Sequence, residues 1–500
     1  MFTLEQGTAR RNALLTRATA RILLSALVVL ATLSFAGAGP AVAEASAANA
    51  PAAPPAGYVA DFVATAATGA AMNEAGDVVG TSYPDPGCGP FCLPTLETVV
   101  WRGAERIVLP AIPGLTGIYV SGINAQGWVA GFAGFPGTTT HAVVWKPNGS
   151  TYQAIDLSTL PGTTISDATG IDDLGRVVGW STTMNFPPTG SPFMWTESGG
   201  MVDLSALGFP DEEPLAISPG GAVSTPGYWY QLGDPNSVVA MPSPPQGFYP
   251  PGTYPTAIND AGDQARFLVS TSGQNLAYLF RFHHEGTWQS ISFTGNGNLS
   301  PYGVGSINAA GDVSATVLGE GVIAYGPDGL TQSLSALLST AYQDSGITVG
   351  GPMNSAGQIL TQIMIGRSQR LMRLTPAQAC TTGCIQVRRL LIQARFVQDP
   401  RDPGHCYQNG RAYNRARVNL KVSNEAGARL NGVVVQGRFL DDYWTNAPVS
   451  GTTNSQGVVS FSYRGQCGVG AIAFLVDSAA RSGLAFDRTV GIVTVWAIPQ

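Results

Sequence analysis

Histidine is the side chain that most often transfers protons or binds metals near neutral pH. This chain has four, His141, His283, His284 and His405. His283 and His284 are adjacent, so on a strand their side chains point to opposite faces rather than toward one metal ion. His141 falls within a repeated strand pattern, which favours packing or a structural hydrogen bond. None of the four therefore predicts a catalytic or metal site.

Paired carboxylates are the next candidates, because glycoside hydrolysis uses two of them across the scissile bond. The adjacent acids are Asp172-Asp173, Asp211-Glu212-Glu213 and Asp441-Asp442. Neighbouring residues rarely face each other across a bond. The first pair lies in a repeated turn, and the other two groups are typical of solvated loops. The sequence also has no Gly-x-Ser-x-Gly elbow and no Gly-x-x-x-x-Gly-Lys-Ser/Thr loop. We assign no catalytic residue and favour a non-enzymatic role.

Turns that contain Asn and Asp could also bind calcium. Asn-x-x-Gly-Asp recurs at Gly76-Asp77, Gly262-Asp263 and Gly311-Asp312. These turns lack the dense oxygen ligands of an EF-hand loop. We therefore expect no cofactor, and calcium is the one alternative kept.

Six cysteines suggest disulfides, because an even number in an exported chain is typical of a disulfide framework. They are Cys88, Cys92, Cys380, Cys384, Cys406 and Cys467. The two C-x-x-x-C pairs resemble zinc half-sites, but no histidine lies near the first pair. We expect the pairs 88–92, 380–384 and 406–467, although spacing leaves other connectivities open.

A basic stripe near the C-terminus is the strongest binding candidate. Residues 415–422 alternate between apolar and polar side chains, as a half-buried strand does. The stripe consists of Arg411, Arg415, Arg417 and Lys421. It is either a solvated strand face or a contact for an anionic glycan or envelope polymer.

Residues 381–500 carry a net charge of +6 and residues 44–380 a net charge of −15. The overall acidity argues against nucleic acid, so the expected partner is a polysaccharide or a surface protein.

Internal repeats predict the architecture that positions these residues. An apolar residue followed by Asn-x-x-Gly recurs, with variations, at intervals of 41 to 51 residues. The motif glycines are Gly76, Gly127, Gly175, Gly221, Gly262, Gly311 and Gly357. Asn favours a turn, and glycine accepts the left-handed conformation that closes a hairpin. In the third unit we expect strands at 165–171, 176–182, 192–196 and 201–205. Four strands per unit indicate a propeller blade, so residues 57–376 predict an all-β, seven-bladed β-propeller. Six blades or a β-solenoid are the alternatives.

The two ends of the repeat region complement each other. The seventh unit reaches its third strand at residues 371–373 and then stops. The segment Val59–Phe62 is similar to Met201–Leu204, the fourth strand of the third unit. We therefore expect the N-terminal strand to complete the last blade, which leaves no open sheet edge.

These repeats resemble those of the HAF family of extracellular repeat proteins. The resemblance depends on the pattern Ile-Asn-x-x-Gly-x-Val-Val-Gly followed by a His-Ala-Phe-Leu-Trp-like strand. His141–Trp145 is the nearest copy, whereas Thr98–Trp101 and Pro192–Trp195 depart from it at the His-Ala positions. The resemblance covers residues 57–375. It implies an extracellular or envelope setting and no particular activity.

A second domain follows a linker at 377–384. Residues 385–500 alternate short strands with turns, which predicts an immunoglobulin-like β-sandwich. Expected strands include 415–422, 432–440, 457–463, 471–476 and 490–496. The domain also resembles accessory domains at the C-termini of some secreted bacterial enzymes, through Gly432–Gly437, Gly451–Asn454 and Gly457–Phe461.

The N-terminus predicts export. Four arginines precede an apolar run from Ile22 to Gly37, and small residues follow at Ala41–Ala43. This order is typical of a signal peptide spanning residues 1–43, followed by an Ala/Pro-rich linker at 44–56. No second run is long enough to cross a membrane.

We expect an exported, non-enzymatic binding protein of the extracellular space, the cell envelope or the periplasm. A carbohydrate-active enzyme with acidic residues in the propeller funnel and a structural envelope component are the alternatives.

Overall fold

The computed structural model describes residues 57–497 except 66, 84–95, 104, 136–138, 185–188, 250–255, 272–276, 292–300, 318–319, 327–329, 339–346, 366–367, 378–379, 396–413, 442–445, 466–471 and 492–493. The predicted signal peptide and the 44–56 linker lie outside the described residues. So do Cys88, Cys92, Cys406, Cys467, His405, Arg411 and Asp442.

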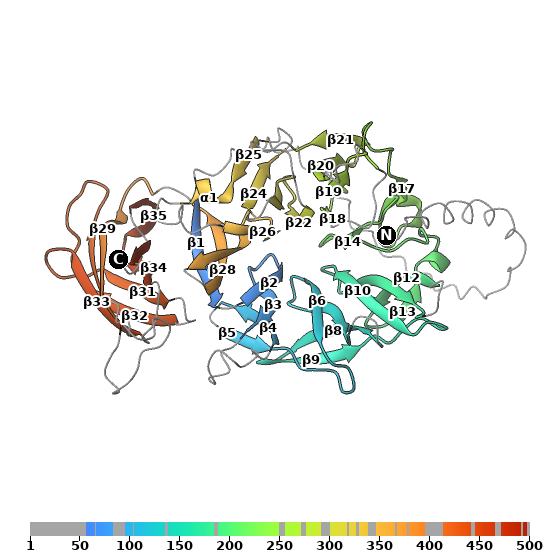
Figure 1. Ribbon diagram of the computed structural model, residues 1–500, viewed down its shortest axis with the longest axis horizontal. Helices are drawn as coiled ribbons and strands as arrows, with labels where there is room; N and C mark the ends of the chain where they lie inside the picture. Colours follow the sequence, from blue (N-terminus) through green and yellow to red (C-terminus); the bar gives the residue numbers. More distant parts are fainter. Residues whose placement is uncertain are drawn as a thin grey trace, which may run out of the picture. The chain divides into compact units, whose positions relative to one another are not determined.

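Seven four-stranded antiparallel sheets form the blades of a propeller around a central channel (Figure 1). Blades 1 to 3 are β2(Ala67–Met72) to β5(Glu105–Val108), β6(Ile118–Ile123) to β9(Thr151–Asp156), and β10(Ile165–Ile171) to β13(Gly200–Asp203). Their middle strands are β3(Val78–Ser82), β4(Glu97–Arg102), β7(Val129–Ala133), β8(His141–Asn148), β11(Val177–Thr182) and β12(Gly190–Thr196). The strands predicted for the third unit agree with β10–β13 to within two residues at each end.

Blades 4 to 6 follow in the same order. Blade 4 consists of β14(Ala216–Ile217), β15(Ala222–Ser224), β16(Tyr228–Gln231) and β17(Val239–Ala240). Blade 5 consists of β18(Thr256–Ile258), β19(Gln264–Val269), β20(Ala277–His283) and β21(Thr287–Ser290). Blade 6 consists of β22(Pro301–Ile307), β23(Val313–Val317), β24(Glu320–Tyr325) and β25(Leu330–Ser333). Among the described residues, three short helical segments connect strands, at Ser205–Leu207, Pro235–Ser237 and α1(Leu334–Leu337).

The seventh blade closes the ring with the N-terminal strand, as predicted. It contains β26(Ile347–Met353), β27(Ile359–Ile365), β28(Ser368–Pro376) and β1(Tyr58–Thr65). β1 pairs antiparallel with β28, and Asp61 lies opposite Arg373. The all-β, seven-bladed prediction is confirmed, and the alternatives of six blades or a solenoid are wrong. Closure removes the open edge that a linear array of sheets would leave.

The repeated Asn-x-x-Gly motif forms the turn between the first two strands of each blade. In blade 2, Gly127 N donates to Asn124 O at 2.9 Å, and Trp128 N donates to Asn124 Oδ1 at 2.8 Å. Gly127 has a φ of +78°, a left-handed conformation that strains any residue with a Cβ. All seven motif glycines have positive φ, as the turn interpretation requires.

The same asparagines also connect neighbouring blades, which the sequence did not predict. Asn73 Nδ2 donates to Asn124 O at 3.0 Å, and Asn124 Nδ2 donates to Asp172 O at 3.0 Å. Across the ring closure, Asn354 Nδ2 donates to Asn73 O at 3.4 Å. Asn73, Asn124 and Asn354 are each under 5% exposed, so their amides are committed to holding the ring together.

Two further four-stranded sheets follow the propeller and enclose one hydrophobic core. One sheet has the order β33(Val458–Gly465), β30(Asn414–Ser423), β29(Cys384–Arg395) and β35(Ala485–Gly491), and the other has the order β32(Asn446–Thr452), β31(Val434–Asp441), β34(Ile472–Ala480) and β36(Thr494–Ala497). Val418 and Leu420 from the first sheet share the core with Phe439 and Phe474 from the second. β29 and β32 have no predicted counterpart, and the strand expected at 490–496 corresponds to the end of β35 and the start of β36. Within the described residues, no helix is long and apolar enough to span a membrane.

Candidate functional site

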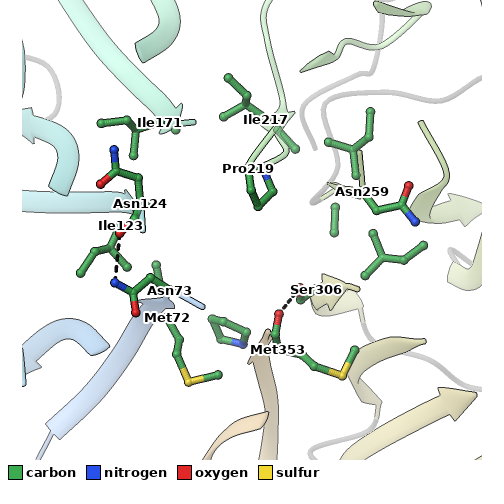
Figure 2. A pocket seen from close by; sticks show the side chains of 18 of the residues that line it. Met72, Asn73, Ile123, Asn124, Ile171, Ile217, Pro219, Asn259, Ser306 and Met353 are labelled. Atoms are coloured by element: carbon green, nitrogen blue, oxygen red, sulfur yellow. Dashed lines mark hydrogen bonds between the residues drawn. The ribbon is translucent and has the colours of Figure 1, made fainter. Parts of the chain in front are cut away.

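The central channel contains a cavity of about 500 Å3 lined by residues from all seven blades. Its apolar band comes from the residue that precedes the Asn position in every repeat. These residues are Met72, Ile123, Ile171, Ile217, Ile258, Ile307 and Met353. Figure 2 shows five of them labelled around the opening. The hydrophobic position of the repeat therefore lines the channel.

Three carboxylates lie at the end of the channel where the Asn-x-x-Gly turns are, which we name the turn end. Each is the residue after the Asn position, in blades 1, 3 and 5. Each accepts a hydrogen bond from a backbone N–H in the turn of the preceding blade. The pairs are Ser355 N to Glu74 Oε2 (3.0 Å), Ala125 N to Asp173 Oδ1 (2.8 Å) and Gly220 N to Asp260 Oδ1 (2.6 Å).

These carboxylates are close enough to affect one another. Partial burial raises the pKa of Asp173; the hydrogen bond from Ala125 opposes this rise, and the charges of Asp172, Asp260 and Glu74 add to it. Among the described residues, no group of three or more His, Cys, Asp or Glu side chains is arranged to hold a metal ion. The turn-end carboxylates therefore connect neighbouring blades.

The opposite end of the inner strands, the loop end, carries a different set of side chains. The fifth residue before the Asn position is Tyr119 in blade 2, Asp167 in blade 3 and Glu213 in blade 4. At about 3.3 Å per residue, this position lies about 16 Å from the turn. Tyr119 is 39% exposed, and its ring stacks on Phe132 with centroids 4.8 Å apart.

The two loop-end carboxylates, Asp167 and Glu213, are open to solvent but have raised pKa values. Thr140 Oγ1 donates to Asp167 Oδ1 at 2.9 Å. Partial burial raises the pKa of Asp167, and the hydrogen bond from Thr140 opposes this only in part. Burial also raises the pKa of Glu213, and the negative charge of Asp167 raises it further. The segment with Glu213 lies beside the strand of Asp167, because Thr169 Oγ1 donates to Pro214 O at 3.0 Å.

The loop end combines acceptors for hydroxyl groups with one exposed aromatic ring. Carboxylates accept hydrogen bonds from several hydroxyls at once, and a tyrosine face covers apolar surface. A pair of carboxyls with raised pKa values also has the composition that acid–base chemistry requires. This end suits a polyhydroxylated ligand.

The histidines named from the sequence pair with carboxylates in separate places. His141 Nδ1 lies 2.9 Å from Asp156 Oδ2, and His284 Nδ1 lies 2.9 Å from Asp263 Oδ1. Burial would raise the pKa of Asp263, but the hydrogen bonds and charge of His284 lower it instead. No described histidine is among the residues that line the channel cavity.

Asp172, Asp441 and Glu212 accept hydrogen bonds from protein groups, whereas Asp211 and Glu213 are exposed and lie outside strands, as the solvated-loop interpretation predicts. Asp172 is fully buried and accepts from Arg176 Nε at 2.6 Å. Asp441 is also fully buried and accepts from the Tyr463 hydroxyl at 2.7 Å, so its interpretation as a solvated loop residue is wrong.

Glu212 also departs from the solvated-loop interpretation. Its Oε2 accepts from Thr225 Oγ1 at 2.8 Å and from Gly227 N at 2.7 Å. These two bonds fix the segment that precedes the inner strand of blade 4.

The aspartates of the Gly-Asp turns, which suggested a calcium site, pair with protein groups instead. Arg102 Nε donates to Asp77 Oδ2 at 3.0 Å, and Gly326 N donates to Asp312 Oδ1 at 2.7 Å. Asp263 is paired with His284. Each of these carboxylates thus pairs with a group of its own blade.

The remaining sequence candidates lie in or near the C-terminal sheets. Cys380 and Cys384 form a disulfide. Arg415 and Arg417 are exposed on β30 and Lys421 is partly exposed, while the alternate side chains of that strand enter the core. The anionic-ligand role of this stripe stays a prediction.

Glu213 was named from the sequence only as one of three adjacent acids, and Tyr119 and Asp167 were missed, although the signal for the loop end is present in the repeats. Tyr119, Asp167 and Glu213 have equivalent positions in three consecutive units. Equivalent positions of adjacent blades are neighbours in a propeller, so alignment of the repeats by their turns would have identified them.

No protein-family model and no curated protein matches this chain. Solved structures give weak matches. One described as a putative gluconolactonase has 13% identity over 64% of this chain and 93% of its own, with a TM-score of 0.30. A mutant of AofleA from Arthrobotrys oligospora has 10% identity over 82% of this chain and 94% of its own, with a TM-score of 0.24. A prolyl endopeptidase has 11% identity over 74% of this chain and 54% of its own, with a TM-score of 0.36. These comparisons assign the chain to no family, and the fold rests on the strand pairing described above.

Proposed function

We propose that this chain is an exported, non-catalytic carbohydrate-binding protein of the cell envelope or extracellular space. The N-terminal signal pattern and the HAF-type repeats support export. The loop end of the propeller is the proposed binding surface.

One observation carries the proposal. Three consecutive blades place an exposed tyrosine and two exposed carboxylates five residues before the Asn position, Tyr119 and Asp167 on the inner strand and Glu213 just before it. Thr169 Oγ1 of blade 3 donates to Pro214 O at 3.0 Å, so the segment with Glu213 lies beside the strand that carries Asp167. Convergence of a few polar groups from several strands is the usual composition of a ligand site.

The turn end supports the proposal by contrast. Its carboxylates accept backbone hydrogen bonds from adjacent blades, so a ligand there would compete with the bonds that hold the ring. Among the described residues, neither Asp167 nor Glu213 is seen to accept a hydrogen bond from a backbone N–H of a neighbouring blade.

Polysaccharide binding by residues 44–500 tests the proposal; this fragment contains the compact unit 51–500. The double variant D167N/E213Q should bind its polysaccharide at least about tenfold more weakly, which is about 1.4 kcal/mol. The control E74Q removes one charge from the turn end and should change affinity less than twofold. Equal weakening in both variants, or retention of no polysaccharide, would refute the loop end as the binding site.

A second candidate function is glycoside hydrolysis. It is favoured by the two neighbouring carboxyls with raised pKa values, the pattern in which one acid protonates a leaving group and the other acts as base or nucleophile. Release of new reducing ends, measured in the same binding mixtures, would establish hydrolysis if D167N and E213Q each abolished it. Retention without release supports the binding protein.

A further inference from the structure

The second surface of interest is the outer face of the sheet that contains β33, β30 and β29. Alternate residues of β30 face outward, because Ala416, Val418, Leu420 and Val422 are all at most 3% exposed and enter the core. The outward positions of β30 are Arg415, Arg417, Asn419 and Lys421.

Strand register extends the basic stripe to both neighbouring strands. Arg415 lies opposite Arg464 of β33, and Lys421 lies opposite Arg389 of β29. Arg389, Arg415, Arg417 and Arg464 are all exposed. The opposing positions contain no acidic residue: Arg417 lies between Ser462 and Gln393, and Asn419 lies between Ser460 and Leu391.

Like charges directly across a strand pair repel each other and destabilise a sheet. Arg389 and Lys421 form such a pair on this face, and none of the ion pairs seen within the described residues joins Arg389, Arg415, Arg417 or Lys421 to an acidic side chain. A polyanion bound to the face would relieve this repulsion. The face is also hollowed beside the stripe, where Arg415, Arg417 and Arg464 line a cavity of about 460 Å3.

We propose that this basic face docks an anionic polysaccharide carrying sulfate or carboxylate groups. This goes beyond the propeller function, since it uses a separate surface of different charge. Arginine binds such groups through paired N–H donors. The neutral side chains between the charges, Asn419, Ser460, Ser462 and Gln393, supply hydrogen-bonding groups for hydroxyls.

The same face fits other polyanions less well. Single-stranded nucleic acid is held largely by stacking on aromatic rings, and none of the described outward side chains is aromatic. A membrane surface requires an apolar face to insert, and Leu391, 44% exposed, is the one large exposed apolar side chain among them.

Titration of residues 44–500 with heparin, polygalacturonate, neutral dextran and a DNA duplex at 0.15 M NaCl tests the proposal. R415S/R417S should weaken binding to heparin or polygalacturonate at least about tenfold and flatten its salt dependence. R415K/R417K should fall between this variant and the wild type, because lysine keeps the charge but loses the paired donors.

The matched control is R429S/R481S, which removes two exposed arginines of the same domain that lie outside β29, β30 and β33. It should change affinity less than twofold, with all variants melting within a few degrees of the wild type. Equal weakening by the control pair, absence of binding to both anionic polysaccharides, or tighter binding to the duplex would each overturn the proposal. Loss of polysaccharide binding in D167N/E213Q tests the propeller proposal separately, because this double variant leaves the basic face intact.

Discussion

The two ends of the propeller channel use the same chemical group in opposite ways. At the turn end, Glu74, Asp173 and Asp260 accept backbone N–H groups from neighbouring blades. At the loop end, Asp167 and Glu213 stay open to solvent and have raised pKa values. An acidic funnel is therefore not by itself evidence of function; what matters is whether its carboxylates accept the backbone hydrogen bonds that join neighbouring blades, whereas Asp167 accepts a side-chain hydroxyl, that of Thr140.

The largest expected effect comes from the buried asparagines of the turn end. Asn124→Ala removes the acceptor of Trp128 N and the donor to Asp172 O. Trp128 N loses its acceptor, while Asp172 O keeps the bond from Gly175 N, so the free energy of unfolding should fall by about 1–3 kcal/mol. Urea denaturation measures this, and the exposed Asn148→Ala in the same blade is the control, with an expected change under about 0.5 kcal/mol. Similar losses in both variants would mean that the asparagines do not hold the ring.

At the loop end, the side chain with the largest expected effect on binding is Tyr119. Tyr119→Ala should weaken polysaccharide binding about tenfold, since it removes an exposed aromatic face, while the loss of its stack on Phe132 should cost about 1 kcal/mol of stability. Calorimetric titration well below the melting temperature separates the two effects. Unchanged affinity would exclude Tyr119 from the binding surface.

A smaller effect is expected from single carboxylates of the turn end. Glu74→Ala leaves Ser355 N without its acceptor and should destabilise the fold by about 1 kcal/mol, with polysaccharide affinity unchanged. Thermal melting and the binding titration are both needed. A loss of affinity without a loss of stability would reverse the roles assigned to the two ends.

The smallest effect is a pH dependence from the loop-end pair. Because the folded-state pKa values of Asp167 and Glu213 are raised, these groups favour the folded state below their unfolded pKa values of about 4, and this stability is lost as pH rises through the folded values. D167N/E213Q should therefore lose less stability than the wild type between pH 4 and neutrality. Parallel stability profiles from urea denaturation would show that the pair is not perturbed.

The repeat spacing predicted the ring because it reports on local turn chemistry. Glycine with positive φ and asparagine at the start of each turn leave a periodic signal, and Val59–Phe62 matches the missing strand in its side-chain pattern. The inter-blade bonds of Asn73 and Asn124 leave no separate signal, because the same amide already explains the local turn. Asp167 was missed since its neighbour Glu213 lies 46 positions later in the chain. The hydrogen-bond partners of Asp441 and Glu212 also lie elsewhere in the chain. The adjacent acids alone therefore indicated a solvated loop.

Hydrogen exchange with and without bound polysaccharide tests the central claim most directly. If the loop end is the binding surface, peptides covering residues 117–120, 139–141, 165–168 and 211–214 gain protection, while those covering the Asn-x-x-Gly turns keep their exchange rates. Protection concentrated at the turns around Glu74, Asp173 and Asp260 would contradict the account.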